Sequence, residues 1–202
     1  MGKITVVNNL SLDGVMQAPG RPDEDPRGGF EHGGWAMPYN DEVKGRAMGE
    51  GMARGGALLF GRRTYEDFYG VWPNRTDNPF TEVLNSAQKY VASTTLKEPL
   101  PWSNSTLLDG DAAEAMARLK DESDEDLAIL GSGALIASLM KRNLIDRWVL
   151  LIHPLVLGSG RRLFADDGTF ATLELTDSLT TTTGVVIATY ESAQQSTTNG
   201  AG

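Results

Sequence analysis

The 202-residue sequence contains no cysteine. This absence excludes disulfide bonds, thiol catalysis, and zinc or iron–sulfur sites held by cysteine. Histidine is almost as scarce, because only His32 and His153 occur, far apart in the chain. Two separated histidines do not make a ligand set, so we expect each to have a structural or surface role and predict no metal site.

Long hydrophobic runs and excess positive charge are also missing. No apolar run reaches the roughly 18 residues that a membrane span needs, and residues 1–9 indicate a strand rather than a hydrophobic signal sequence. The chain has 18 basic and 27 acidic residues, a net charge of −9. Nucleic acids and anionic membranes attract basic surfaces, so the charge argues against both as partners. We expect a cytoplasmic protein.

The arrangement of apolar residues predicts one α/β domain over residues 1–191. Buried strands and amphipathic helices alternate up to about residue 152, and strands predominate afterwards. The expected strands are residues 3–10, 57–60, 89–92, 127–130, 147–152, 173–176 and 185–190, and the clearest helices are 41–54 and 111–120. This order predicts a mainly parallel sheet with helices on both faces and an antiparallel C-terminal edge hairpin. Residues 192–202 are expected to form a disordered tail.

The most informative stretch is residues 127–139, LAILGSGALIASL. A short buried strand ends at the turn Gly131-Ser132-Gly133, after which the apolar spacing becomes helical. Unpaired N–H groups and the helix dipole converge at such a helix start, which suits a phosphate or pyrophosphate. Plain turns also use Gly-x-Gly, so the stretch alone leaves both interpretations open.

Two further strands are followed by turns of similar character, residues 61–64 and 93–94. Ligands of open α/β sheets collect beyond the carboxyl ends of the strands, so three such turns could hold one dinucleotide. Arg62 and Arg63 could bind its phosphates, because a guanidinium makes bidentate, permanently charged contacts. The alternative is a surface ion pair with Glu66 or Asp67.

Residues 11–34 form a long loop rich in glycine and proline. A loop of this length in a compact domain is usually functional or disordered. Its aromatic residue Phe30 and the adjacent Trp35 favour a cover over a pocket.

Several segments, in order along nearly the whole chain, resemble the dihydrofolate-reductase-like superfamily. Within it, the chain is similar to the reductase domain of bifunctional riboflavin-biosynthesis enzymes. The matching segments are SLDG at 11–14, GRRTYE at 61–66, LGSG at 130–133, LID at 144–146, PL at 154–155 and LGSGRRLF at 157–164. The resemblance implies an NADPH-dependent reductase built on an eight-stranded sheet, and a homodimer.

The resemblance also implies a role for individual residues. The adenosine phosphates would be held by Gly61, Arg62, Arg63 and Thr64, and the adenine ribose by Ser93 and Thr94. The pyrophosphate would be held by Gly131, Ser132, Gly133, Ala134 and Leu135. Asn9 and Met16 would lie by the nicotinamide. The substrate would face Asp13, Trp35 and Phe68.

Asp13 is our candidate catalytic residue. Beside the nicotinamide, its carboxylate could orient the substrate or assist protonation as hydride arrives. Asp-Gly is equally a common turn pair, so a turn role stays open. Asp41 or Glu42 could be a second acid near the substrate, but both also suit the first turn of a helix.

Two departures from the family limit what can be transferred. The sequence has no deaminase domain, and the first loop has only Arg21 and Arg27 to meet a phosphorylated substrate. We therefore predict an NADPH-dependent reductase of a small heterocyclic or carbonyl/imine substrate. One alternative is a non-catalytic nucleotide- or flavin-binding protein of this fold. Another is a structural dimer module with residues 155–163 at its interface.

Overall fold

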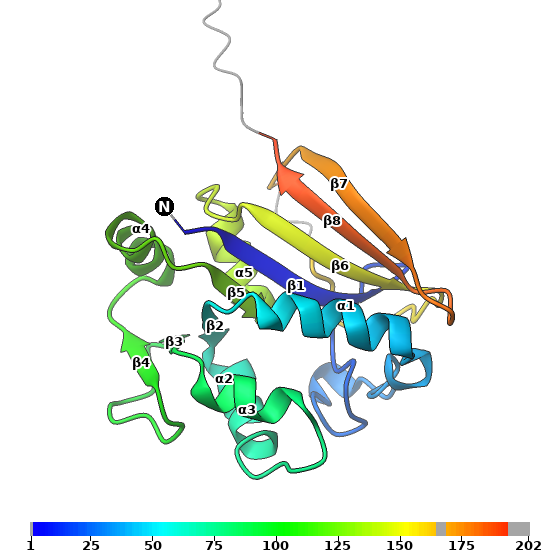
Figure 1. Ribbon diagram of the computed structural model, residues 1–202, viewed down its shortest axis with the longest axis horizontal. Helices are drawn as coiled ribbons and strands as arrows, with labels where there is room; N and C mark the ends of the chain where they lie inside the picture. The colour runs from blue at the N-terminus through cyan, green and yellow to red at the C-terminus, as the bar shows by residue number, and fades with distance from the viewer. Residues whose placement is uncertain (1, 165–168, 194–202) are drawn as a thin grey trace, which may run out of the picture.

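The structure is a computed structural model that describes residues 2–164 and 169–193. Its centre is an eight-stranded sheet in the order β4-β3-β2-β5-β1-β6-β8-β7 (Figure 1). Along the chain the strands are β1 (Ile4–Ser11), β2 (Ala57–Gly61), β3 (Lys89–Ala92), β4 (Ser105–Leu108), β5 (Leu127–Leu130), β6 (Arg147–His153), β7 (Leu173–Thr180) and β8 (Val186–Ser192). Strands β1 to β6 pair in parallel, whereas β8 pairs antiparallel with β6 and β7. The predicted parallel sheet with an antiparallel edge hairpin is confirmed.

Helices cover both faces of this sheet, as predicted. They are α1 (Glu42–Ala53), α2 (Arg62–Val71), α3 (Phe80–Ser86), α4 (Ala112–Glu122) and α5 (Gly133–Met140), with short 3₁₀ turns η1 (Arg27–Gly29) and η2 (Met37–Tyr39). In Figure 1, α1, α2 and α3 lie on the near side of the strands. Helices α4 and α5 pack against the other face.

The alternation of side chains along β1 explains why the two faces differ. Ile4 and Val6 are fully buried and pack with α4 and α5 in the main core. Thr5 and Val7, which point to the opposite face, are only half-buried. The α4–α5 face is therefore a continuous core, while the other face is incompletely covered at its centre.

Two separate clusters occupy that second face. One surrounds Phe60 and Tyr65 and includes α2, α3 and Trp102. The other joins Leu151 of β6 and Ile187 of β8 to α1. The surface of β1 and β5 between these clusters is left open, and this opening becomes the floor of a cleft.

The prediction missed two short elements and placed the end of the last strand wrongly. Strand β4 and helix α3 were not expected, because β4 is a half-exposed edge strand with little apolar pattern and α3 has only seven residues. The expected tail also begins too early, since Ser192 ends β8 and its Oγ donates to the Ile145 carbonyl. Residues 194–202 lie outside the described residues.

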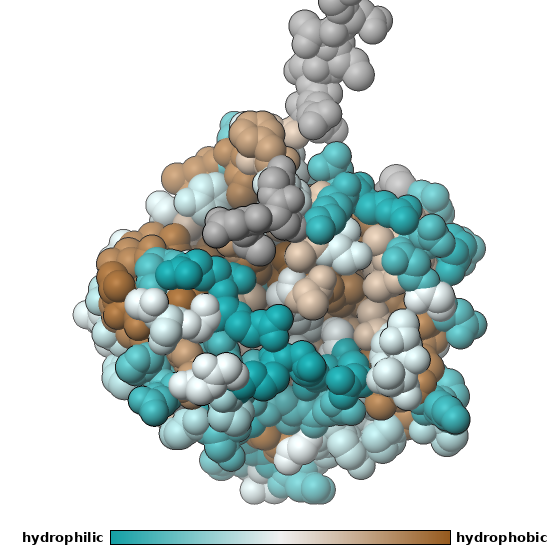
Figure 2. Space-filling view, turned by 180° about the vertical axis from the view of Figure 1, so that it is seen from behind, coloured by the Kyte–Doolittle hydropathy of each residue, from teal (hydrophilic) through white to brown (hydrophobic). Residues whose placement is uncertain are grey.

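The edge hairpin carries exposed apolar side chains. Phe170, Leu175 and Leu179 are 85%, 55% and 42% exposed. Figure 2, which shows the molecule from behind, has hydrophobic surface gathered on the side of this hairpin. Among the described residues, no helix is long and apolar enough to cross a membrane.

Candidate active site

A single cleft runs over the carboxyl ends of the central strands and continues beneath α1; we call it the main cleft. Its volume of about 2020 Å³ exceeds the roughly 300–1,000 Å³ of common ligand pockets. It is lined by all three predicted turns, at residues 61–64, 93–94 and 131–135. These turns meet because β2 lies between β3 and β5, so their carboxyl ends are neighbours. The expectation that they share one rim is confirmed.

Direct hydrogen bonds connect the turn after β2 to the turn after β5. The Gly61 N–H donates to Ser132 Oγ at 2.9 Å, and the Ser132 N–H donates to Thr64 Oγ1 at 3.2 Å. Each turn begins a helix, and neither α2 nor α5 is capped by a side chain at its N-terminus. The first N–H groups of two helices therefore face the cleft and are open to an anionic ligand.

The close approach of neighbouring groups explains the small residues of the turn after β5. Gly131 has a φ of +70°, and a Cβ there would lie 3.3 Å from Thr64 Cγ2. A Cβ at Gly133 would lie 2.8 Å from Met16 Sδ, a contact that real side chains do not make. Met16 therefore rests directly on the start of α5, as the predicted role of both residues in one site requires.

The two predicted phosphate-binding arginines differ in their surroundings. Arg62 makes an ion pair with Glu66 at 2.9 Å, which is the surface-pair alternative raised by the sequence. Arg63 is exposed, lines the main cleft, and has no hydrogen-bond or ion-pair partner among the described residues. Arg63 therefore has the freer charge for a ligand.

The turn after β3 has both predicted residues in the cleft lining. Ser93 Oγ accepts from the N–H groups of Thr95 and Leu96, so this hydroxyl organises the turn. Thr94 is exposed beside it. The turn is shaped by its own hydrogen bonds before any ligand arrives.

The carboxyl end of β1 has unmet hydrogen-bonding groups. Strand β5 pairs with β1 only as far as Val7, so the edge of β1 that faces β5 loses its neighbour from Asn8 onward. Asn8 Nδ2 and Asn9 Oδ1 are buried without a hydrogen-bond partner in the structure, and both residues line the main cleft. Buried polar atoms are rarely left unpaired in folded proteins, so each of these two atoms could take a hydrogen bond from or to a ligand.

Asp13 lies just beyond β1 and is not part of the cleft lining. Its Oδ1 accepts from Ser11 Oγ and the Leu157 N–H, and its Oδ2 accepts from the Gly158 N–H and the Arg162 guanidinium. The Ser11 hydrogen bond, followed by the backbone bonds, lowers the pKa of Asp13 to about 2. These contacts describe an anchor for the 154–162 loop, and a catalytic role for Asp13 stays a prediction.

Of the other two residues predicted to contact the substrate, one lines the main cleft and one does not. Phe68 lines the main cleft and packs on Phe60 with ring centroids 5.2 Å apart. Trp35 does not line it; this side chain is 7% exposed and its Nε1 donates to the Gln17 carbonyl. Phe30 is buried in the same small cluster as Trp35. The part of the first loop that reaches the cleft is residues 16–21 and 24–27.

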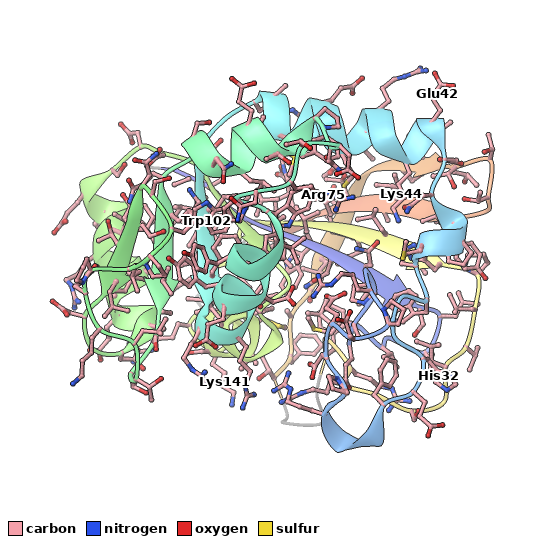
Figure 3. The ribbon with its side chains drawn as sticks, turned by 90° about the horizontal axis from the view of Figure 1, so that it is seen from below. His32, Glu42, Lys44, Arg75, Trp102 and Lys141 are labelled. Carbon is pink, nitrogen blue, oxygen red and sulfur yellow. The ribbon has the colours of Figure 1, made fainter. Side chains whose placement is uncertain are left out.

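The two acids at the start of α1 are both accounted for by local structure. Asp41 caps α1 by accepting from the Lys44 N–H at 2.8 Å, and it also accepts from Thr182 Oγ1. The Thr182 hydrogen bond, above all, holds the pKa of Asp41 well below its usual range. Glu42 points away from the sheet into solvent (Figure 3).

The sequence analysis missed a buried pair at the α1 end of the main cleft. Lys44 Nζ lies 3.3 Å from His153 Nε2, and both residues are buried. Figure 3 shows Lys44 pointing from α1 toward the strands. The available signal was that Lys44 shares a helical face with Ala47 and Met48, at spacings of three and four residues. A lysine on an inward face is uncommon and marks a position to inspect.

Two proteins of Bacillus subtilis strain 168 are similar to this chain in sequence. The protein YyaP is 30% identical over 138 residues, which are 66% of this chain and 72% of YyaP. The protein YwjB is 37% identical over 112 residues, which are 53% of this chain and 57% of YwjB. Both carry names that state no activity.

Three solved structures share the fold at low sequence identity. A putative riboflavin biosynthesis protein from Shewanella sp. PV-4 has a TM-score of 0.68 at 22% identity and covers 95% of this chain and 99% of its own. A pyrimidine reductase-like protein from Corynebacterium diphtheriae has a TM-score of 0.66 at 13% identity, with 96% and 92% covered. RibD of Acinetobacter baumannii has a TM-score of 0.61 at 13% identity, with 96% of this chain but 58% of RibD covered.

The model of the RibD C-terminal domain family matches residues 2–187. This match extends from the start of β1 into β8 and contains every residue that lines the main cleft except Thr189. The chain belongs to the RibD C-terminal domain family.

Proposed function

We propose that this protein is an NADPH-dependent reductase that transfers hydride to a small heterocyclic or carbonyl/imine substrate. The observation that carries the proposal is the junction of the turns at residues 61–64 and 131–135, where two uncapped helix starts face one cleft. Family membership and the name of one structural neighbour, a pyrimidine reductase-like protein, support the same reaction class.

The residues present fit a dinucleotide. The open N–H groups of Gly133 and Ala134 would hold the pyrophosphate, and Arg63 would meet the phosphate on the adenosine ribose. Ser93 and Thr94 would lie by that ribose. Asn9, with its unpaired Oδ1, would hold the carboxamide of the nicotinamide, with Met16 against it. The cofactor would supply the hydride.

The chain itself would supply placement and a dry environment. A donor carbon and an acceptor carbon need to lie about 3–3.5 Å apart for transfer. Phe68 of α2, Val7 of β1 and Val149 of β6 give the cleft apolar surface, and such surface excludes water from the reacting atoms.

A proton must also reach the reduced atom of a carbonyl or imine. Asp13 and Asp41 both have lowered pKa values and hold protons poorly. Glu24, in the first loop, lines the cleft, and burial raises its pKa. Of these three acids only Glu24 has a raised pKa, so Glu24 is the candidate proton donor.

The test combines binding and turnover. At 100 times its dissociation constant, NADPH should stabilise the protein by about 2.7 kcal/mol, read as a rise in melting temperature with enhanced nicotinamide fluorescence. Turnover is then measured with pterins, ribosylaminopyrimidines and simple carbonyls. Stabilisation without turnover would favour a non-catalytic nucleotide-binding protein, and no stabilisation by NADPH or NADH would contradict the proposal.

A homodimer is part of the proposal. The exposed apolar residues Phe170, Leu175 and Leu179 lie on or beside the edge strand β7, and Val156 is 68% exposed. Exposed apolar side chains at a sheet edge can be covered by a second copy of the chain. Light scattering during size-exclusion chromatography should give the mass of two chains, and a monomer would contradict this part.

A further inference from the structure

Lys44 is a buried cation in the wall of the main cleft. Lys44 is only 9% exposed, whereas all other residues of α1 are half-buried or exposed. The side chain lines the cleft, and its one hydrogen-bond contact among the described residues is Nζ to His153 Nε2 at 3.3 Å. An ammonium group carries three donors, so two of them are open to a ligand.

His153 cannot neutralise this charge. Its Nδ1 lies 2.9 Å from the Leu151 carbonyl, so Nδ1 carries the hydrogen and Nε2 accepts from Lys44. The rings of Trp35 and Tyr39 pack edge-on against the imidazole at 5.1 and 5.5 Å. Burial, and then the charge of Lys44, lower the pKa of His153 to about 4, so the imidazole is neutral at pH 7.

Asp41, the carboxylate whose charge acts on Lys44, makes its own hydrogen bonds elsewhere. Asp41 accepts from the backbone N–H of Lys44, from Thr182 Oγ1 and from the Thr183 N–H, and its oxygens have no contact with Nζ among the described residues. A buried charge without a counter-ion is costly unless something else pairs with it. The structure therefore keeps an incompletely paired cation in a site that a ligand can reach.

Other basic residues of the main cleft do not share this condition. Some are ion-paired, as Arg21 is with Asp67 and Arg75 with Asp77. Others, such as Arg54 and Arg63, are exposed to solvent. Lys89 is fully buried outside the cleft lining, and its Nζ donates to three carbonyl oxygens. The fold thus satisfies a buried lysine where the role is structural, and leaves Lys44 unsatisfied.

The sheet order shows which ligand Lys44 would meet. The proposed cofactor residues lie on the turns after β3, β2 and β5 and at the end of β1. His153 ends β6, on the far side of β1 from β5, and α1 holds Lys44 above it. A group bound to Lys44 therefore lies beyond the nicotinamide end of the cofactor, where the substrate must be.

We propose that Lys44 binds an anionic oxygen of the substrate and that His153 positions its ammonium group. Val7, Val149 and Leu151 form an apolar patch under α1, while Thr5 and Arg147 add polar groups farther along the same lining. The substrate would therefore place a flat or apolar group on this patch and carry one anionic oxygen group. This inference rests on the proposed function in that it takes the ligand to be the substrate of the reductase.

The test uses three aromatic probes of similar size: benzoate, phenyl phosphate and neutral benzamide. Their affinities for the parent protein are measured by calorimetry, and that of NADPH is measured separately. We expect at least one anion to bind at least about tenfold more tightly than benzamide, since hydrogen bonds to charged groups contribute this much. Lys44→Met should remove that preference and leave the affinities for benzamide and NADPH within twofold.

Two further variants keep the test decisive. Lys44→Gln loses the charge but keeps a donor for His153, so it gives the same test if the methionine variant does not fold. Lys97→Met removes one charge from an exposed position and should keep the preference. The inference is overturned if the parent shows no anion preference, if both Lys44 variants keep it, or if Lys97→Met loses it equally. If NADPH does not bind but Lys44 still selects an anion, the reductase proposal fails and the anion site stands.

Discussion

The two halves of the main cleft are built in different ways. The half over β2, β3 and β5 consists of three turns, and it offers backbone N–H groups, hydroxyls and an exposed arginine. The half under α1 combines apolar side chains of β1 and β6 with polar ones such as Thr5 and Arg147, and it contains the buried Lys44. The first can bind a long, polyanionic ligand through repeated weak donors, whereas the second can select a small ligand through a single charge. This division is what a reductase with a general cofactor and a particular substrate needs.

The largest loss of cofactor binding in the half over β2, β3 and β5 is expected from a substitution that disfavours the backbone conformation of Ser132. Its φ of 61° lies in the left-handed region, which β-branched residues avoid. Ser132→Val should cost about 3 kcal/mol of unfolding free energy, from strain of about 1–3 kcal/mol and one lost hydrogen bond. NADPH affinity should fall at least tenfold, while benzoate binding under α1 should persist. Calorimetry and urea unfolding measure these quantities.

Ser132→Gly is the matched control for that variant. Glycine accepts the same φ without strain but lacks the Oγ that accepts from the Gly61 N–H. It should lose about 1 kcal/mol and bind NADPH better than the valine variant. Equal NADPH affinities of the two variants would show that the conformation of this turn does not matter for the cofactor.

A second comparison separates a structural lysine from the lysine of the α1 half. Lys89→Met leaves three carbonyl oxygens without their donor and removes a cation from the face of Trp102, 4.6 Å away. It should lower the unfolding free energy by about 3 kcal/mol. Lys44→Met should change it by less than about 1 kcal/mol, because removing an unpaired buried charge offsets the lost contact with His153.

Urea denaturation of both variants measures this difference. A loss at Lys44→Met as large as that at Lys89→Met would mean that Lys44 stabilises the fold, and the contrast between the two lysines would disappear.

The arginines of the turn after β2 offer a finer test of the cofactor half. Arg63→Ala should weaken NADPH binding about tenfold, equivalent to about 1.4 kcal/mol, and leave NADH binding unchanged. Arg62→Ala should have a smaller effect, because Glu66 already pairs with that guanidinium. Equal losses for NADPH and NADH would show that neither arginine recognises the additional phosphate.

The first half could be predicted from the sequence because each of its turns is a local signal. An apolar run followed by Gly131-Ser132-Gly133 indicates where a strand ends. Parallel strands bring their carboxyl ends to the same edge of the sheet. That β1, β2, β3, β5 and β6 belong to a mainly parallel sheet could be predicted for the same reason, whereas β4, a half-exposed edge strand, gives little apolar signal. The turns could be placed without knowing which side chains they touch.

The α1 half could not be predicted in this way. Lys44 and His153 are 109 positions apart, and they meet only because α1 crosses the end of β6. His153 ends a strand before a proline, where a structural role is the ordinary expectation, and the structure does bury it between two aromatic rings. The missing quantity was the burial of Lys44, which depends on tertiary packing of α1 and not on its local sequence.

Substitution of Asp13 tests whether this residue is catalytic or only anchors a loop, and its expected effect is small. Asp13→Asn replaces one acceptor oxygen by an amide that opposes the Gly158 N–H, so it should cost about 1 kcal/mol at pH 7. The folded protein lowers the pKa of Asp13 to about 2. This contribution is present above the ordinary pKa of about 3.9 and is lost as pH falls toward 2. Melting of parent and variant should therefore differ at pH 7 and converge near pH 2, with NADPH affinity and kcat unchanged. A fall in kcat with normal melting would instead support a catalytic role for Asp13, because a loop anchor acts on stability first.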